Sequence, residues 1–422
     1  MLAPLTVIAV AVLAYALLSG RLASTVVTAP IFFAAIGLIA GPVLGIVVME
    51  PGDEALTMLL EAALVMVLFA DSSSLDVRHF TRERSLSERL LGLGLPLTMV
   101  LGAVVASILI PGIAPWQAAL VGIILAPTDA ALGQAVVANP RVPALVRNAL
   151  NVESGLNDGL ALPFVTIFLT VGLVASGMEG ELHAIQTLLL ALVGSSAVGV
   201  ALGVGGGLLI RGGAARGLVT GRWLPISLVA LAAAAFSVAD AFEASGFLSV
   251  WVAGLTTGMM IRGHVPESNF HLSEQLAELL AAIGFFLLGV GLLGPVVGRA
   301  TPVTVVYAAL SLTLVRILPV ALSLLRTGLA RPTVLYVGWF GPRGLASIVF
   351  AGLVVESAVP GASTIADVIL LTVAISLVAH GATAAWGARR YADWFGRASA
   401  ADPGIPEAAA PAGPSKAAAP RG

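Results

Sequence analysis

The sequence predicts an all-α polytopic membrane protein with about thirteen transmembrane helices. Of its 422 residues, 58% are hydrophobic and only 10% are charged. A soluble protein carries about 25% charged residues, so this composition excludes a soluble globular protein. The 47 Gly and 24 Pro lie largely inside apolar runs, which membrane helices tolerate better than soluble helices do.

Charge and cysteine content exclude further classes of protein. The net charge of −2 argues against a nucleic-acid partner. Because the chain has no cysteine, it has no disulfide, no cysteine-ligated metal and no catalytic thiol. The first apolar run, residues 2–20, has no basic region before it and no soluble domain after it, so we interpret it as a transmembrane helix. We expect the lipid bilayer as the partner and no cofactor.

The apolar runs define the individual spans. A helix needs about 20 apolar residues to cross a bilayer, and thirteen segments approach this length. They are residues 2–20, 23–49, 55–71, 90–110, 116–138, 147–175, 184–210, 224–241, 246–261, 272–293, 302–325, 333–355 and 364–387. From Ala398 the chain turns to Ala, Pro and Gly, which predicts a transmembrane domain at 1–397 and a disordered cytoplasmic tail at 398–422.

The arginines support this count of spans. They follow every odd-numbered span, whereas the loops after even-numbered spans carry only Arg299 and several of those loops are acidic. Cytoplasmic loops are the ones rich in Lys and Arg. The pattern therefore predicts an integral protein of the cell (inner) membrane with its N-terminus outside and its C-terminus in the cytoplasm. A missed or an additional span would disrupt the alternation.

Spans five and twelve each contain a helix-breaking run at mid-depth. The runs are Ala-Pro-Thr-Asp at 126–129 and Gly-Pro-Arg-Gly at 341–344. Span twelve comes seven spans after span five. Because seven is odd, the two spans cross the bilayer in opposite directions. Paired interrupted spans in inverted halves indicate a transporter binding site, although two simple proline kinks are the structural alternative. Asp129 is suited to cap exposed N–H groups, and Arg343 is suited to meet exposed carbonyls.

Ionisable residues within the spans are the candidates for function, because charge at membrane depth is costly. The alternative is that some of them only pair with one another to hold the bundle together. In span six, Ser154 and Asp158 are four residues apart and therefore lie one turn apart on one helical face. A hydroxyl and a carboxylate near broken backbone form an all-oxygen site, which hard cations prefer. The full set of candidate ionisable residues is Glu61, Asp129, Glu153, Asp158, Arg316 and Arg343.

Several motifs extend this interpretation. They are Leu-Phe-Ala-Asp-Ser at 68–72, Ala-Pro-Thr-Asp at 126–129, Glu-Ser-Gly-Leu-Asn-Asp-Gly at 153–159, Gly-Phe-Leu-Ser-Val-Trp-Val-Ala-Gly at 246–254, Val-Arg at 315–316, Gly-Pro-Arg-Gly-Leu-Ala-Ser at 341–347 and His-Gly at 380–381. With these motifs the chain resembles bacterial monovalent cation:proton antiporters of the NhaP type, relatives of animal sodium/proton exchangers. The Asn-Asp pair, with Thr-Asp one span earlier, is the most specific part of the resemblance.

The resemblance implies a role for each matching residue of the ion site. Asp158 would bind the cation or the proton, and Asn157 would be its neutral neighbour. Ser154 and the backbone at Thr128 would add oxygen ligands, so that Asp158 and Ser154 hold the transported Na+. Glu61 resembles the acidic residue that the family carries near the ion in span three.

The resemblance also implies structural roles and an overall arrangement. Glu153 would pair with Arg316, and Asp129 and Arg343 would stabilise the crossed half-helices. Two inverted six-helix repeats, spans one to six and eight to thirteen, would form a mobile core and the scaffold of a homodimer.

We therefore predict a transporter, not an enzyme, that exchanges Na+, with Li+ or K+ as alternatives, for H+ by alternating access. Cation and proton would compete for Asp158, and exchange would be electroneutral because the other acids are expected to be paired. A sodium-coupled symporter of an organic anion is the main alternative and would need a larger polar cavity. An intramembrane hydrolase built on Ser154 would need a histidine at the same depth, which none of the five histidines provides. A pore is less suited to paired broken helices with a lone acid.

Overall fold

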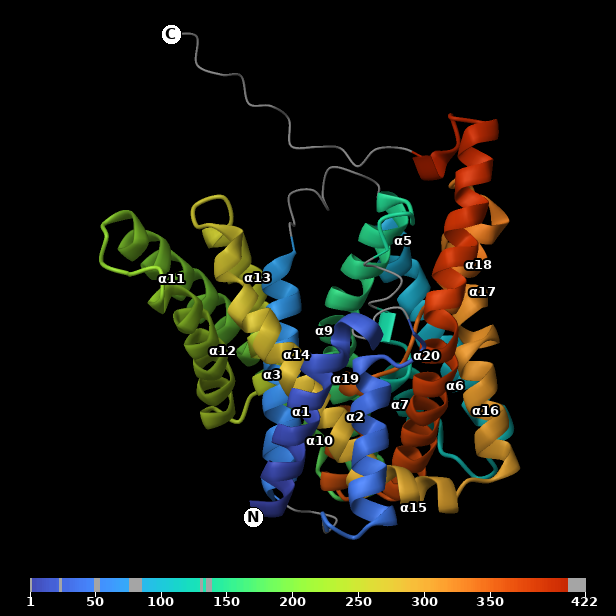
Figure 1. Cartoon of the computed structure of the whole chain (residues 1–422). Coiled ribbons are helices and arrows are strands. Elements are labelled where there is room, and N and C mark those ends of the chain that lie inside the picture. The colour runs from blue at the N-terminus through green and yellow to red at the C-terminus, as the bar shows by residue number, and fades with distance from the viewer. Residues whose placement is uncertain are drawn as a thin grey trace.

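The computed structural model describes residues 2–22, 25–48, 54–75, 86–129, 132–133 and 139–408. Within these ranges the chain consists of helices joined by loops, without a named strand. Figure 1 shows an elongated bundle in which the start of α1 (Leu2–Leu22) and the end of α20 (Ala362–Ala401) lie at opposite ends. The first and last long helices of the described chain thus point to opposite ends of the bundle, an arrangement that an odd number of crossings would produce.

Most of the helices are long enough to cross a bilayer. By length and composition, nine described segments could each span a membrane. They are Pro4–Leu22, Thr57–Ser74, Leu86–Leu109, Ala144–Ala175, Glu181–Ala215, Trp223–Ala241, Glu267–Gly298, Pro302–Ser323 and Ala362–Ala401. Four shorter apolar helices lie at Ala29–Val43, Pro115–Ile124, Gly246–Ile261 and Leu345–Glu356. Each predicted span overlaps one of these segments, which confirms an all-helical membrane protein, while thirteen crossings stay a proposal.

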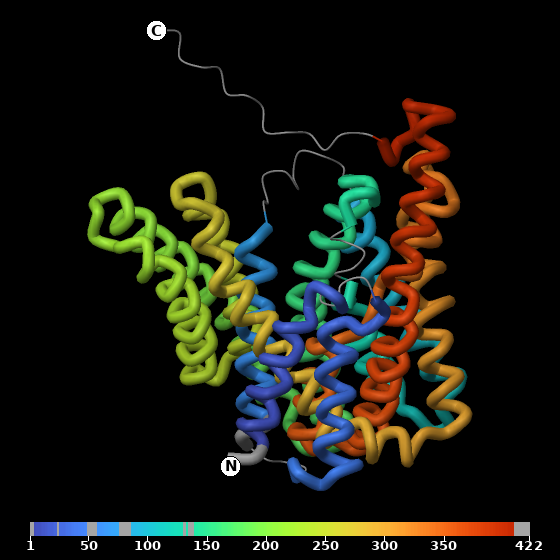
Figure 2. The backbone as a smooth tube through the Cα atoms, in the orientation of Figure 1, coloured from blue at the N-terminus to red at the C-terminus, as the bar shows by residue number. Residues whose placement is uncertain are grey.

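The helices fall into two groups according to their contacts. Their bounds are α1 as above, α2 (Ala29–Leu38), α3 (Glu54–Ser74), α5 (Leu86–Arg89), α6 (Leu95–Leu109), α7 (Pro115–Ile124), α9 (Ala144–Ala175), α10 (Glu181–Leu189), α11 (Ser195–Ala215), α12 (Trp223–Ala241), α13 (Gly246–Ile261), α14 (His271–Leu287), α15 (Leu293–Gly298), α16 (Pro302–Leu312), α17 (Leu314–Ser323), α18 (Arg331–Trp339), α19 (Leu345–Glu356) and α20 as above. In the first helix group, α11 and α3 pack on α13, and α14 packs on α3 and α2. In the second, α6 and α9 pack on α7, and α16 and α19 pack on α20. Figure 2 shows α11 to α13 on one side of the molecule and α16, α17, α18 and α20 towards the other.

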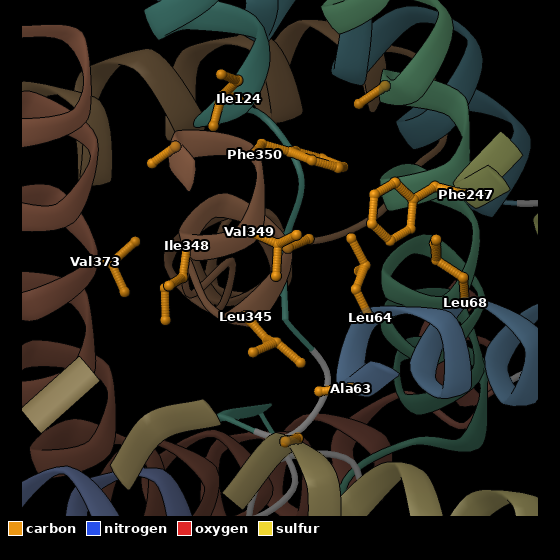
Figure 3. Close-up of a cluster of buried hydrophobic side chains, with 14 of the residues drawn as sticks. Ala63, Leu64, Leu68, Ile124, Phe247, Leu345, Ile348, Val349, Phe350 and Val373 are labelled. Atoms are coloured by element: carbon orange, nitrogen blue, oxygen red, sulfur yellow. The ribbon is translucent and has the colours of Figure 1, made fainter. Parts of the chain in front are cut away.

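Helix α19 lies at the centre of the core, where the two groups meet. A helix that is apolar on every side is normally buried, and Leu345 to Ala351 of α19 are all buried. Figure 3 shows its side chains between those of α3, α13 and α20, with Leu345 and Val349 directed towards Leu64 of α3. The core therefore holds one half of a broken span in a fixed position.

Both spans with helix-breaking runs are interrupted in the structure. Helix α7 ends at Ile124, residues 125–129 are not helical, and residues 132–133 are helical again. Helix α18 ends at Trp339, and α19 begins at Leu345. The rest of span five, residues 130–131 and 134–138, lies outside the described residues.

The predicted start of the tail, at residue 398, lies near the end of α20. Helix α20 continues past residue 398 to Ala401, because the Ala-rich sequence there favours helix. A short 3₁₀ turn follows at Pro406–Ala408. In this turn Glu407 is buried and accepts hydrogen bonds from the backbone N–H of Ala330 (2.8 Å) and the hydroxyl of Thr333 (2.6 Å), which caps the start of α18. The remaining tail, 409–422, lies outside the described residues.

Candidate functional site

The two broken spans cross at their interruptions. The backbone N–H of Asp129 donates a hydrogen bond to the carbonyl of Pro342 (2.8 Å). The hydroxyl of Ser347, in the first turn of α19, donates to the carbonyl of Ile124 at the end of α7 (2.8 Å). These bonds join segments more than two hundred residues apart in the chain and fix the two breaks against each other.

Asp129 lies where one half-helix begins. Its carboxylate accepts hydrogen bonds from the backbone N–H of Leu345 (2.9 Å) and of Leu132 (3.3 Å). A carboxylate at this position stabilises exposed N–H groups and the positive end of the helix dipole of α19. Gly344 allows this close approach, since a Cβ there would lie 1.7 Å from the Asp129 carboxylate.

Arg343 lies on the other side of the crossing. Its guanidinium is fully buried and donates through Nη1 to the carbonyls of Ala126 (3.0 Å) and Pro127 (3.1 Å). These carbonyls follow the C-terminal end of α7, where positive charge is favourable. Asp129 and Arg343 thus make the contacts with exposed backbone groups that their residue types suggest.

Glu153 and Arg316 form an ion pair in the protein interior. Two hydrogen bonds join their side chains, from Nη1 (2.5 Å) and Nη2 (2.9 Å) of Arg316 to the two carboxylate oxygens, and each side chain is only 1% exposed. A bidentate, charge-assisted pair of this kind is strong and geometrically specific. The negative charge of Glu153 is therefore balanced locally and is not free to hold a mobile ion.

Three polar side chains connect span six to the break in span five. The hydroxyls of Thr128 and Ser154 lie 3.1 Å apart, and the amide nitrogen of Asn157 donates to the Thr128 hydroxyl (2.8 Å). All three residues are buried. The resemblance implied a role for the Thr128 backbone, and the structure shows that its hydroxyl also belongs to the cluster. Asn157 holds Thr128 in place by this bond.

Asp158 lies one turn after Ser154 on α9 and is only 8% exposed. Among the described residues, no hydrogen bond or ion pair reaches its carboxylate. A buried carboxylate without a partner is costly, so it is expected to hold a proton or a cation. In this respect Asp158 differs from both Glu153 and Asp129.

A cavity of about 810 Å³ leads to Asp158 from one end of the bundle. Its walls come from α1, α2, α3 and α14 of the first helix group and from α9, α19 and Asp129 of the second. Ser154 and Asp158 lie at its buried end, whereas Glu267, His271 and Glu274 line it where the chain is exposed. Figure 1 places the connection between α13 and α14 at the same end of the bundle as the end of α20. The cavity thus extends from Asp158 to the exposed surface between the two helix groups.

The acid of α3 that faces this cavity is Asp71, which the sequence analysis did not select. Asp71 lines the cavity opposite Asp158, whereas the described lining residues do not include Glu61. Asp71 and Glu61 are ten positions apart in the chain, which separates them by about 15 Å along the helix. The structure therefore does not bring Glu61 to the predicted site. The motif at 68–72 contained the signal, since Asp71 is an acid in a predicted apolar span.

Residues 8–389 match the sodium/hydrogen exchanger, transmembrane, family model. The chain belongs to the sodium/hydrogen exchanger family. Members of this family are cation/proton antiporters, which are transporters rather than enzymes.

Curated relatives carry antiporter names. The K+/H+ antiporter NhaP of Alkalimonas amylolytica is 27% identical over 401 residues, which cover 93% of this chain and 67% of that protein. The K+/H+ antiporter NhaP2 of Shewanella oneidensis is 27% identical over 294 residues, which cover 65% of this chain and 47% of that protein. The exchanger-family chain thus spans about two thirds of the first relative and about half of the second.

Solved structures show the same fold. The sodium proton antiporter MjNhaP1 from Methanocaldococcus jannaschii, determined at pH 8, superposes with a TM-score of 0.72 at 19% identity, over 92% of this chain and 97% of that one. At this identity the likeness establishes the exchanger fold and not the transported ion. These relatives and structures are named as antiporters, and they lend no support to the symporter alternative.

Proposed function

We propose that the chain is a secondary active antiporter that exchanges Na+, with Li+ or K+ as alternatives, for H+ by alternating access. The observation that carries this proposal is the buried carboxylate of Asp158, without a partner among the described residues and at the end of a cavity. Such a group can be neutralised by a proton or by a cation, but not by both together. Competition for one carboxylate couples the two fluxes.

The oxygen atoms around Asp158 suit a small monovalent cation. The hydroxyls of Ser154 and Thr128 lie 3.1 Å apart beside the break, and Ser154 is one turn before Asp158 on α9. Hard cations prefer oxygen ligands. In this proposal Asp158 and Ser154 bind the cation, Thr128 adds an oxygen, and Asn157 orients Thr128 through its amide nitrogen.

Charge balance supports exchange of one cation for one proton. Arg316 neutralises Glu153, and backbone N–H groups hold the Asp129 carboxylate, so neither acid needs to change its proton content during the cycle. Asn157 cannot ionise. One titrating carboxylate carries one Na+ in one direction and one H+ in the other, and both loaded states are neutral. Asp71 is the acid whose participation would change this stoichiometry.

The position of the cavity supports alternating access. Since the site lies between the two helix groups, a rocking movement of one group against the other would close one entrance and open another. We propose that the antiporter domain, residues 1–397, contains thirteen crossings in two inverted six-helix repeats and forms a homodimer. The basic loops support an orientation in the cell (inner) membrane with the cavity entrance and the C-terminus on the cytoplasmic side and the N-terminus outside.

Reconstitution tests the proposed function. Purified protein in proteoliposomes with a trapped pH-sensitive dye is exposed in turn to Na+, Li+, K+ and Ca2+, without any organic solute. We expect at least one monovalent cation to drive proton movement and Ca2+ to drive none. Proton movement that requires an organic anion would instead identify a symporter, and no response to any monovalent cation would refute the proposal.

A further inference from the structure

One motif of the sequence, His-Gly at 380–381, has no role in the site described so far. His380 lies in α20, the helix that follows the broken span, and it is only 1% exposed. Its Nε2 lies 2.9 Å from the carbonyl of Trp339, the last residue of α18. Its Nδ1 lies 3.0 Å from the hydroxyl of Ser376, one turn earlier in α20. His380 therefore contacts the end of α18. Its partner Ser376 lies closer to the start of α19.

Three residues of α20 contact the break between α18 and α19. The hydroxyl of Ser376 accepts a hydrogen bond from the backbone N–H of Arg343 (2.7 Å), and the hydroxyl of Thr383 accepts one from the indole nitrogen of Trp339 (3.0 Å). Together with His380 they follow a spacing of four and then three residues, which places them on one face of a helix. An unbroken helix thus supports both sides of the interruption.

The donors and acceptors of this network favour one arrangement of protons on the histidine ring. The Trp339 carbonyl can only accept, so Nε2 of His380 carries a proton. The Arg343 backbone N–H can only donate, so Ser376 accepts it and its own hydroxyl proton is free to go to Nδ1. A neutral ring protonated on Nε2 thus links Trp339 to Arg343 through His380 and Ser376, while the backbone carbonyl of Ser376 also lies 3.1 Å from Nδ1. A leucine would not form this connection.

The network extends to the proposed cation site. Arg343, whose backbone is held by Ser376, donates its guanidinium to the carbonyls of Ala126 and Pro127, directly before Thr128. We propose that Ser376 and His380 are positioning residues, which hold the 340–344 break so that Arg343 fixes the backbone beside Thr128. This inference rests on the proposed function, because it assigns the network to the site where Thr128 and Asp158 bind the cation.

Four variants test the inference through the apparent KM for the cation that the wild-type protein exchanges. His380→Leu removes the donor to Trp339, and Ser376→Ala removes the acceptor for Arg343. His380→Gln keeps an N–H donor of similar reach. Thr372→Val is the matched control, since Thr372 is equally buried on α20 but its hydroxyl bonds only within its own helix, to Val368.

We expect His380→Leu and Ser376→Ala to raise the apparent KM about three- to tenfold, the effect of losing one or two neutral hydrogen bonds at the site. The apparent KM of His380→Gln should stay within about twofold of the wild-type value, and the apparent KM of Thr372→Val should equal the wild-type value. If His380→Leu does not fold, Ser376→Ala alone still decides, because it removes a single oxygen atom.

Two results would overturn the positioning role. One is a wild-type KM in both His380→Leu and Ser376→Ala, even if their melting temperatures fall, because that would show a role in stability alone. The other is an equal rise in KM for all four variants. Failure of the proposed function looks different: the wild-type protein would then exchange no cation, and no site would exist for these residues to position.

Discussion

Replacing Glu153 with glutamine removes one charge from the buried ion pair and leaves the other in place. Both carboxylate oxygens of Glu153 accept hydrogen bonds from Arg316, and neither side chain is more than 1% exposed. In Glu153→Gln the guanidinium would remain in the interior without a counter-ion. Its Nε already has no hydrogen-bond partner among the described residues, so the remaining structure offers it little compensation.

The magnitude follows from the burial of the pair. Removing one partner of a buried ion pair costs about 3–5 kcal/mol, because an uncompensated charge stays in the interior. Asp158→Asn should behave differently, since the Asp158 carboxylate has no partner among the described residues to lose. We therefore expect Glu153→Gln to lower the melting temperature clearly, and Asp158→Asn to leave it unchanged or to raise it.

The assay is thermal unfolding of the purified variants in one detergent at one pH. The double variant Glu153→Gln/Arg316→Met is the control, because it removes both charges. The double variant should lose less stability than the sum of the losses in Glu153→Gln alone and Arg316→Met alone. The difference, which is the coupling energy of the pair, should be roughly 0.5–3 kcal/mol, the range seen for residues in direct contact. Two results would refute the assignment of Glu153 as the structural acid. One is a lower melting temperature for Asp158→Asn than for Glu153→Gln. The other is a double variant whose loss of stability equals the sum of the losses in Glu153→Gln and Arg316→Met.

Three further predictions concern topology, stoichiometry and the second acid of the cavity. Single cysteines report cleanly because the chain has none of its own: Arg216→Cys should react only from the cytoplasm and Gly180→Cys only from outside, and the reverse labelling would overturn the orientation. A membrane potential acts on net charge moved, at about 2.3 kcal/mol per charge per 100 mV, so the Na+ gradient that balances a fixed pH gradient should not shift when a potential is imposed on proteoliposomes. A shift would mean that a second acid titrates. Because Asp71 lines the cavity and Glu61 does not, Asp71→Asn should change the apparent KM for the cation more than Glu61→Gln does, and the opposite order would restore Glu61 to the site.

Local sequence patterns predicted the parts of the site that depend on one segment at a time. The helix-breaking residues at 126–129 and 341–344 mark the two interruptions, because proline and glycine disrupt helices wherever the chain then folds. The spacing of Ser154 and Asp158 places them on one face of α9 for the same local reason. The pairing of Glu153 with Arg316, 163 residues apart, came from the family resemblance and not from a pattern in the chain.

Other parts of the site depend on how distant segments meet, and local patterns do not contain this information. Two acids ten residues apart in α3 look alike in sequence, and only the packing of α9 against α3 at Gly155 shows that Asp71 faces the cavity. The contacts of Ser376 and His380 with the break likewise require α20 to lie beside it. The hydrogen bond from the Ala330 backbone N–H to Glu407 likewise joins two segments that are distant in the chain.

The central claim is that Asp158 carries both the cation and the proton. Its most direct test compares cation-driven proton movement in proteoliposomes containing equal amounts of folded wild-type or Asp158→Asn protein. We expect the wild-type protein to exchange and Asp158→Asn to exchange nothing at any pH, because asparagine can neither release a proton nor balance the charge of a cation. Proton exchange by Asp158→Asn at the wild-type rate would contradict the account.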